Sequence, residues 1–308
     1  MWELATKRHK NHKPSCESCA FLWLILLLFL DAMKKDIHVA HSPDSDDAFM
    51  FYALATRKID TGDLNYVHTL SDIETLNRKA MIGEYDVSAI SFHAYAYMAD
   101  KYALASCGAS MGRNYGPIVV SGKPMRAKAL ANKIVAIPGT LTSAFLALRL
   151  FEPAVKYKVV PFDKILDEVQ KGNNDAGLLI HEGQLTYREL GLHKVVDLGQ
   201  WWLKQTGLPL PLGGNVIKRD LGRKVMERVV QDIRNSIQYG LDHREEATAY
   251  AIQFSRGLDA QRVDRFIGMY VNELTLDYGS EGKQAVRRLL QEAYKKKIIP
   301  ERVALEFI

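Results

Sequence analysis

The sequence predicts an α/β protein with two lobes, a central cleft and two hinge crossings. The chain has 308 residues, which exceeds the roughly 100 to 200 residues of a usual single domain. Short apolar strands alternate with helices over most of its length, and two breaks rich in glycine and proline interrupt this series. We therefore expect each lobe to contain its own sheet and its own hydrophobic core.

The composition is that of an ordinary globular protein, with 47% hydrophobic and 25% charged residues. The formal net charge is +5, but its distribution is uneven. Residues 1–35 carry six Lys or Arg against three Asp or Glu, whereas the rest of the chain carries 35 against 33. This balance leaves no basic surface suited to a phosphate backbone, so we predict no nucleic-acid partner.

The first 35 residues are predicted to form a non-globular extension. Their apolar run, Ala20 to Leu30, is shorter than the ~20 residues that a transmembrane helix needs, so we expect no stable membrane insertion. The run has the length of a signal-peptide core, but residues 30–32 lack the small outer residue that cleavage prefers. We expect the functional protein to begin at or near Met33, just before the first strand.

Cysteine usage indicates a reducing compartment, and we predict a cytoplasmic protein. Cys16 and Cys19 lie in the extension, which leaves Cys107 alone in the globular part. With His9 and His12 these two cysteines match no common zinc module, so we predict no metal there.

The elements follow one another in a regular order. Residues 37–40 are predicted to form a buried strand, followed by a Ser-Pro-Asp turn and a helix over 47–55. After a strand over 64–70, Ser71 and Glu74 have the spacing of a capping box, which starts a helix that ends near Gly83. Further strands are predicted over 87–90, 102–107, 118–121, 133–137, 157–160, 176–180 and 194–198. Strands interleaved with helices predict largely parallel sheets.

Two breaks define the predicted lobes, one over residues 116–124 and the other over 209–214. After the second break, amphipathic helices are predicted over 220–242, 244–256, 260–272 and 281–297. We therefore assign residues 36–122 with 216–308 to the first lobe and 123–215 to the second.

Candidate site residues follow the carboxyl ends of the predicted strands, where ligands bind in open α/β sheets. This rule selects residues 41–47, 91–93, 140–144 and 181–183. Because these segments come from both predicted lobes, we expect the ligand to bind in the cleft.

The segment Pro138 to Ala144 joins a strand to a helix. Its backbone N–H groups and hydroxyls would face an anion with a favourable helix dipole, which suits a carboxylate and predicts a small anionic substrate. Helix N-capping by Thr142 or Ser143 explains the same residues equally well. The sequence has neither a GxGxxG motif nor a P-loop, which disfavours dinucleotide and P-loop chemistry.

The segment His41 to Asp47 gathers acidic side chains at a helix start. It lacks the glycine and the distal glutamate of an EF-hand loop, so we predict no calcium. Capping and dipole compensation explain most of it, and Asp47 is also a candidate for hydrogen bonds to substrate hydroxyls.

Three histidines are candidates for a catalytic base. His181 follows an apolar strand, and imidazole has an ordinary pKa near ~6.5, which suits proton abstraction around neutrality. A histidine after a strand is more often structural, and His41 and His93 compete with it. Their spacing does not decide among them.

Tryptophan and arginine side chains near the breaks receive a structural interpretation. Trp201 and Trp202 are adjacent and should point apart, so we expect at least one to pack in the core. Arg113 is expected to be solvated at the surface rather than to pair with a substrate carboxylate.

Three separated segments carry a resemblance to a known family. They are HSPDSDDAFMF at residues 41–51, IHEGQLTY at 180–187 and TGLPLPLG at 206–213. Together and in this order they resemble the 1,4-dihydroxy-6-naphthoate synthase family of the futalosine route to menaquinone. The resemblance runs from Ile37 to the C-terminus and leaves out the first 35 residues.

The resemblance implies a two-lobed fold like that of type II periplasmic binding proteins, used as a lyase without metal or cofactor. The implied reaction converts cyclic dehypoxanthinyl futalosine to 1,4-dihydroxy-6-naphthoate and releases the remaining sugar-derived fragment. It implies that His181 is the proton acceptor. The implied substrate contacts are Ala89, Ile90, Ser91, Thr142, Ser143 and Ala144.

Two other functions remain open at this point. A non-catalytic solute-binding protein would share the two lobes, although His181 and the poor cleavage site weigh against it. The chorismate dehydratase of the same route shares the general architecture but not the Ile-His-Glu-Gly segment at 180–183. The oligomeric state cannot be read from the sequence.

Overall fold

The computed structural model describes residues 34–255 and 258–308. The predicted start at Met33, the apolar run and the cysteines and histidines of the extension lie outside the described residues. The chain divides into two compact units, Met1–Asp36 with Thr61–Asn65, and Ile37–Asp60 with Tyr66–Ile308. In the described part of the first unit, Asn65 Nδ2 donates to Asp36 Oδ1 at 2.8 Å. The candidate site belongs entirely to the second unit.

The first sheet has the strand order β2-β1-β3-β11-β4, and β5 also pairs with β11. Its strands are β1 (Lys35–His41), β2 (Leu64–Leu70), β3 (Val87–Ser91), β4 (Tyr102–Leu104), β5 (Ser110–Gly112) and β11 (Leu210–Lys218). β1 runs parallel to β3, whereas β11 runs antiparallel to β3, β4 and β5.

The second sheet has the order β10-β6-β9-β7-β8. Its strands are β6 (Ile118–Ser121), β7 (Ile134–Ile137), β8 (Lys156–Val159), β9 (Ala176–Leu179) and β10 (His193–Asp197). β7 is parallel to β8 and β9, but β6 is antiparallel to β9 and β10. The prediction of largely parallel sheets is therefore wrong. β6 and β11 each follow a strand of the other sheet in the chain, so neither is joined to a neighbouring strand of its own sheet by the helical crossover that makes strands parallel.

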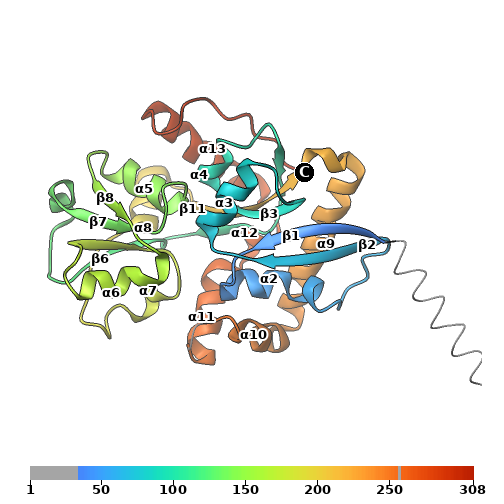
Figure 1. Ribbon diagram of the computed structural model, residues 1–308, viewed down its shortest axis with the longest axis horizontal. Coiled ribbons are helices and arrows are strands. Elements are labelled where there is room, and N and C mark those ends of the chain that lie inside the picture. The colour runs from blue at the N-terminus through green and yellow to red at the C-terminus, as the bar shows by residue number, and fades with distance from the viewer. Residues whose placement is uncertain (1–33, 256–257) are drawn as a thin grey trace, which may run out of the picture. The chain divides into compact units, whose positions relative to one another are not determined.

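The chain passes between the two sheets twice (Figure 1). It leaves the first sheet after β5 and enters the second at β6, then returns from α8 (Leu198–Thr206) to β11. Both passages fall at or beside the predicted breaks, and β11 itself occupies the second one. The predicted lobe boundaries stay a prediction, since sheet membership alone does not define a lobe.

The second sheet is covered by helices on both faces (Figure 1). Val119 packs in one core with residues of α5 (Ser143–Phe151) and α8. Its neighbours Ile118 and Val120 pack in another core with α6 (Ile165–Gln170) and with Tyr187, which follows α7 (Gly183–Thr186). This alternation is the period of two that a strand buried on both faces requires.

The first sheet carries α2 (Ser45–Ala55) and the C-terminal helices. α2 packs against α9 (Arg223–Asp242), α10 (Arg244–Ile252) and α11 (Ala260–Tyr270). Its consecutive residues Phe49, Met50 and Phe51 are all buried, as expected for a helix enclosed on every side. The other helices beside the first sheet are α3 (Ile73–Met81), α4 (Phe92–Tyr95), α12 (Glu273–Leu276) and α13 (Gly279–Lys295). Short 3-10 helices lie elsewhere along the chain at Ala127–Asn132, Phe162–Lys164 and Arg219–Leu221.

The predicted capping box at Ser71 and Glu74 is wrong. α3 is capped by Asp72, whose Oδ1 accepts a hydrogen bond from Thr75 N at 3.0 Å. The carboxylate of Glu74 instead accepts hydrogen bonds from Leu141 N and Arg78. The helix is therefore still capped locally, but by Asp72, and the Glu74 carboxylate contacts Arg78 of the same helix and the distant Leu141.

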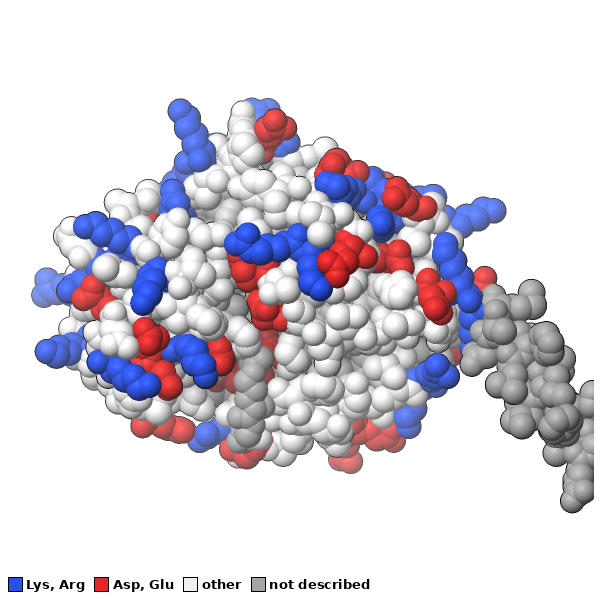
Figure 2. Space-filling model, in the orientation of Figure 1, with Lys and Arg blue, Asp and Glu red and all other residues white. Residues whose placement is uncertain are grey.

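On the face shown in Figure 2, Lys and Arg are interspersed with Asp and Glu. This view agrees with the balanced charge of the globular sequence. No helix within residues 34–255 and 258–308 has both the length and the apolar character needed to cross a membrane.

Candidate active site

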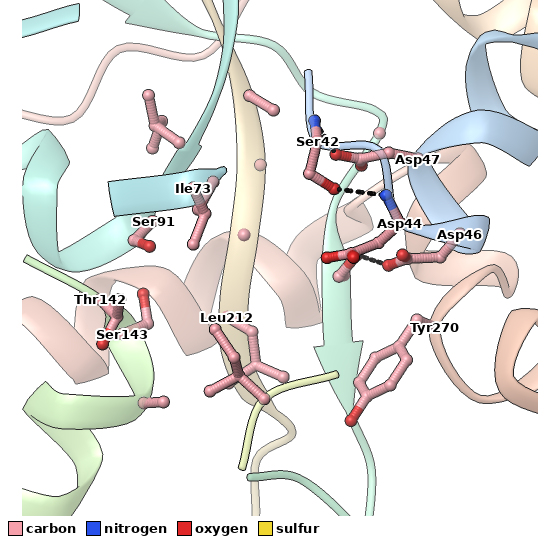
Figure 3. A pocket seen from close by; sticks show the side chains of 18 of the residues that line it. Ser42, Asp44, Asp46, Asp47, Ile73, Ser91, Thr142, Ser143, Leu212 and Tyr270 are labelled. Carbon is pink, nitrogen blue, oxygen red and sulfur yellow. Dashed lines mark hydrogen bonds between the residues drawn. The ribbon is translucent and has the colours of Figure 1, made fainter. Parts of the chain in front are cut away.

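A pocket is lined by loops that follow strands of both sheets (Figure 3). It brings together all seven residues expected to contact substrate, which lie in three separate segments: Asp47, Ala89 to Ser91, and Thr142 to Ala144. Further lining residues, which the sequence did not indicate, come from the β4–β5 region, β11 and α11: Gly108, Ser110, Gly213, Asn215, Phe266 and Tyr270. The strand-end rule therefore identified two sides of the pocket and missed the others.

One side of the pocket is acidic. Asp44, Asp46 and Asp47 lie in and after the β1–α2 loop, as Figure 3 shows. Ser42 N donates to Asp47 Oδ2 at 2.8 Å, and Ser110 Oγ donates to Asp46 Oδ2 at 3.1 Å. Asp44 occupies the N-cap position of α2, but its side chain makes no capping hydrogen bond. Helix capping therefore does not explain this acidic cluster. Asp46 and Asp47 lie in the first turn of α2, where negative charges interact favourably with the helix dipole.

Burial changes the protonation of these carboxyl groups. Burial raises the pKa of Asp47 to about 6, although the hydrogen bonds from Ser42 oppose this shift. Burial also raises the pKa of Asp46 well above its usual range, and the negative charges of Asp47, Asp44 and Glu182 add to it. This side of the pocket therefore holds protons that exposed aspartates would lose.

The opposite side of the pocket is the start of α5. Thr142 is its N-cap, and Thr142 Oγ1 accepts a hydrogen bond from Phe145 N at 3.1 Å. Ser143 Oγ accepts from His93 N at 3.2 Å. Both hydroxyls thus serve the structure of the protein, as the capping interpretation expects. Ser143 and Ala144 supply the first amides of the helix, which have no partner within it.

The loop before α5 already holds a carboxylate of the protein itself. Leu141 N donates to Glu74 Oε2 at 3.1 Å. A Cβ atom on Gly139 would lie 2.2 Å from Glu74 Oε2, so the Glu74 side chain would have to move to admit one. An external anion would therefore have the amides of Ser143 and Ala144 as its partners rather than the whole loop.

Neighbouring residues of β3 and β11 form the floor of the pocket. The register places Ala89 opposite Asn215 and Ser91 opposite Gly213. Ser91 is fixed by Asn77, which accepts from Ser91 N at 2.8 Å and donates to Ser91 Oγ at 3.2 Å. Asn215 Nδ2 donates to Gly108 O at 3.1 Å.

Tyr270 closes another part of the pocket (Figure 3). Its hydroxyl donates to Gln184 Oε1 at 3.2 Å. Burial raises the pKa of Tyr270 far above its ordinary value, so the phenol stays protonated.

His181 lies directly after Ile180, which lines the pocket, but the imidazole is not among the lining groups of the described chain. His181 is 8% exposed. Its Nδ1 accepts a hydrogen bond from Gly183 N at 3.0 Å, so Nε2 carries the proton and donates to Phe162 O at 3.1 Å. Proton acceptance at Nδ1 therefore requires the Gly183 N–H to leave the ring.

His41 and His93 are poor candidates for a base. Burial lowers the pKa of His41 to about 3, and the charge of His68 adds to this effect. Burial also lowers the pKa of His93 to about 4. Each ring has a structural partner, since His41 Nδ1 lies 3.0 Å from Ser42 O and His93 Nδ1 lies 3.3 Å from Thr142 O. A general base works best with a pKa near the operating pH.

The side chains near the breaks behave as structural groups. Trp202 is buried and its Nε1 donates to Pro209 O at 3.2 Å, whereas Trp201 is partly buried beside the core. Arg113 is exposed and forms an ion pair with Glu281.

Comparison with protein families and curated proteins gives consistent matches. Residues 37–295 match the family described as Menaquinone biosynthesis. A protein of Thermus thermophilus named 1,4-dihydroxy-6-naphthoate synthase is 39% identical over 257 residues, which cover 83% of this chain and 93% of that protein. A protein of the same name from Streptomyces coelicolor is 36% identical over 270 residues, covering 86% of this chain and 95% of that protein.

Solved structures agree on the fold. Protein AF1704 of Archaeoglobus fulgidus is 46% identical, with a TM-score of 0.83 over 86% of this chain and 98% of that one. A Candida albicans protein described as having the generic periplasmic binding protein fold is 12% identical, with a TM-score of 0.64 over 88% of this chain and 98% of that one. At this identity the second likeness concerns the fold alone, and the fold is that of the periplasmic binding proteins.

Proposed function

The chain belongs to the Menaquinone biosynthesis family and is an enzyme of the 1,4-dihydroxy-6-naphthoate synthase type, and we propose that its substrate is cyclic dehypoxanthinyl futalosine. The proposed products are 1,4-dihydroxy-6-naphthoate and the remaining sugar-derived fragment. We further propose that the reaction takes place in the cytoplasm and needs no metal or cofactor.

One observation carries this proposal most strongly. Seven residues expected to touch substrate, drawn from three segments between Asp47 and Ala144, line one pocket. In the proposed complex the substrate carboxylate accepts hydrogen bonds from the amides of Ser143 and Ala144 at the start of α5, where the helix dipole favours a negative charge. Asp47, on the acidic side, is proposed to bind substrate hydroxyls.

We propose His181 as the proton acceptor. A base that removes a proton beside a carbonyl starts carbon–carbon cleavage, and the new aromatic ring makes the reaction favourable. The lone pair that takes the proton is on Nδ1, because Nε2 donates to Phe162 O. The turn at Glu182 and Gly183 must therefore shift when substrate binds.

Such a shift fits a protein that closes on its ligand. We propose that residues 36–122 with 216–308 and residues 123–215 move as two lobes about the two passages between the sheets. The pocket has lining residues after strands of both sheets, such as Asp47 and Ser143, which supports this proposal. Small-angle scattering with and without saturating product should give different profiles, and identical profiles would favour a rigid cleft.

The test of the proposed function is turnover by the purified protein. The protein is incubated with cyclic dehypoxanthinyl futalosine, with and without a chelator, and the naphthoate is followed by chromatography and mass. Formation of naphthoate at the same rate with chelator is the expected result. Binding without turnover would instead identify a solute-binding protein, and dehydration of chorismate in a parallel reaction would identify the chorismate dehydratase activity.

A further inference from the structure

Asn215 carries a buried hydrogen-bond acceptor in the wall of the pocket. The residue is 1% exposed and lines the pocket. Its Nδ2 donates to Gly108 O at 3.1 Å, which fixes the orientation of the amide. Among the described residues no group donates to Asn215 Oδ1. A buried acceptor without a donor is unfavourable, so such atoms in native proteins need an explanation.

The residues around Asn215 leave room for a ligand beside its side chain. Asn215 is paired with Ala89, and Gly213, two residues earlier on β11, is paired with Ser91. Residues two apart on a strand lie on the same face, so these four residues share the pocket floor. Among the described residues, a Cβ atom on Gly213 would have only Ile90 O within 4 Å, at 3.4 Å. The floor beside Asn215 is therefore open to a ligand.

Gly108 keeps the Asn215 amide close to the backbone. Gly108 has a φ of +75°, and a Cβ atom there would lie 2.2 Å from Asn215 Nδ2. The amide nitrogen is thus committed to the protein, and the oxygen is left for a partner outside it. That partner must be a hydrogen-bond donor, because Oδ1 accepts only.

We propose that Asn215 determines specificity by accepting a hydrogen bond from a hydroxyl of the substrate. This inference rests on the proposed function and adds to it the orientation of the substrate in the pocket. The carboxylate lies at the start of α5, and the hydroxylated ring lies over the floor of β3 and β11. Figure 3 shows Thr142 and Ser143 on one side of the pocket and Asp44, Asp46 and Asp47 on the other, with Leu212 between them.

The expected effect is discrimination between ligands rather than general tight binding. A site with a buried polar group rejects an analogue that lacks the matching hydroxyl, because the group then stays unpaired. The product 1,4-dihydroxy-6-naphthoate has a carboxylate and two hydroxyls, whereas 2-naphthoate has the same rings and carboxylate without hydroxyls. The wild-type protein should bind the dihydroxy compound at least about tenfold more tightly.

The experiment measures the affinity of both compounds for wild type and for Asn215→Leu and Asn215→Asp by calorimetric titration. Asn215→Leu should bring the two affinities within about threefold and change the affinity for 2-naphthoate much less. Asn215→Asp keeps an acceptor oxygen but can donate to Gly108 O only when its carboxyl group is protonated, so it should retain the preference at low pH. Asn174→Ala is the control, since Asn174 is also buried but bonds to Glu168 away from the pocket, and it should leave both affinities unchanged.

The outcomes separate this inference from the proposed function. A wild type that turns over the futalosine derivative while Asn215→Leu keeps the full preference would overturn the inference alone. A wild type that binds neither compound and gives no turnover would overturn both. If Asn215→Leu does not fold, Asn215→Ala replaces it, and a wild type without any preference for the hydroxyls would by itself reject the proposal.

Discussion

Ser45 Oγ donates a hydrogen bond to Glu182 Oε1 at 3.0 Å and so joins the start of α2 to the turn after β9. Both residues are buried, and 137 positions separate them in the chain. Glu182 directly follows His181. The bond therefore links the acidic side of the pocket to the segment that carries the proposed base.

Ser45→Ala should lower both stability and turnover. Loss of the donor leaves the buried carboxylate of Glu182 with one partner fewer, which costs about 1–3 kcal/mol of unfolding free energy. Ser121→Ala is the matched control, because Ser121 is also fully buried and donates to Lys123 O at 2.8 Å outside the pocket. Denaturant unfolding and steady-state kinetics should show lower stability in both variants and a lower kcat only in Ser45→Ala. Equal kcat in the two would separate this bond from catalysis.

Replacing the proposed base should abolish most of the turnover. His181→Asn keeps a polar group of similar size but cannot accept a proton near neutral pH. A general base contributes about 10²- to 10⁴-fold in rate, so kcat should fall by that factor while the affinity for product changes much less. A kcat within about threefold of wild type would exclude His181 as the base.

Gly183→Ala tests the position of His181 without removing it. A Cβ atom on Gly183 would lie 2.8 Å from His181 Cε1 and 3.3 Å from Nδ1, so the ring must move. We expect kcat to fall at least about tenfold with KM nearly unchanged, because a displaced base loses alignment with the reacting proton. Gly172→Ala makes the same substitution where no atom lies within 4 Å, but at a φ of +76°. It should therefore lower the melting temperature and leave kcat unchanged.

Two neighbouring glycines of β11 should respond oppositely to the same substitution. The added methyl group in Gly213→Ala enters the pocket, so product affinity should fall while stability changes by less than about 1 kcal/mol. In Gly214→Ala the Cβ atom would lie 2.6 Å from Tyr278 Oη and 2.8 Å from Phe92 Cζ. Such overpacking costs about 1–3 kcal/mol. Thermal unfolding together with product titration distinguishes the two effects, and a stable Gly214→Ala would contradict the packing argument.

Binding of an anionic product should weaken as pH rises through about 6. Burial raises the pKa of Asp47 to about 6, so this group is neutral below that pH and negative above it. Unit charges ~10 Å apart repel by roughly 1.5 kcal/mol at an effective dielectric constant of about 20, which is about tenfold in affinity. Titrations at pH 5 and pH 7.5 should show this change for the wild type and a smaller one for Asp47→Asn. The neutral compound 1,4-dihydroxynaphthalene is the control and should bind equally at both values.

The sequence predicted the regular elements well and missed those that depend on distant partners. The strand over 64–70 and the strand over 118–121 have the predicted bounds. The sequence of β11 predicts a break instead of a strand, because Pro209, Pro211, Gly213 and Gly214 are typical of turns. Pro211 is tolerated because it lies where β11 pairs irregularly with the short strand β5.

Site residues that depend on distant partners were likewise not predictable from the sequence. Asp47, Ser91 and Thr142 follow strands and were found by the strand-end rule. Asn215 directly follows the break over residues 209–214, and no local pattern points to it. Its importance comes from Gly108, which is 107 positions away, and only the folded chain brings the two together.

Glu74 and Gly139 are in close contact, so a substitution at one position affects the other. A side chain at position 139 would occupy the space of the Glu74 carboxylate, since Cβ would lie 2.4 Å from Glu74 Cδ. Shortening Glu74 first removes that obstacle but leaves Leu141 N without its acceptor. The two substitutions should therefore show non-additive energetics. A larger residue at position 139 therefore requires the Glu74 side chain to move or to be replaced, which couples two positions 65 residues apart in the chain.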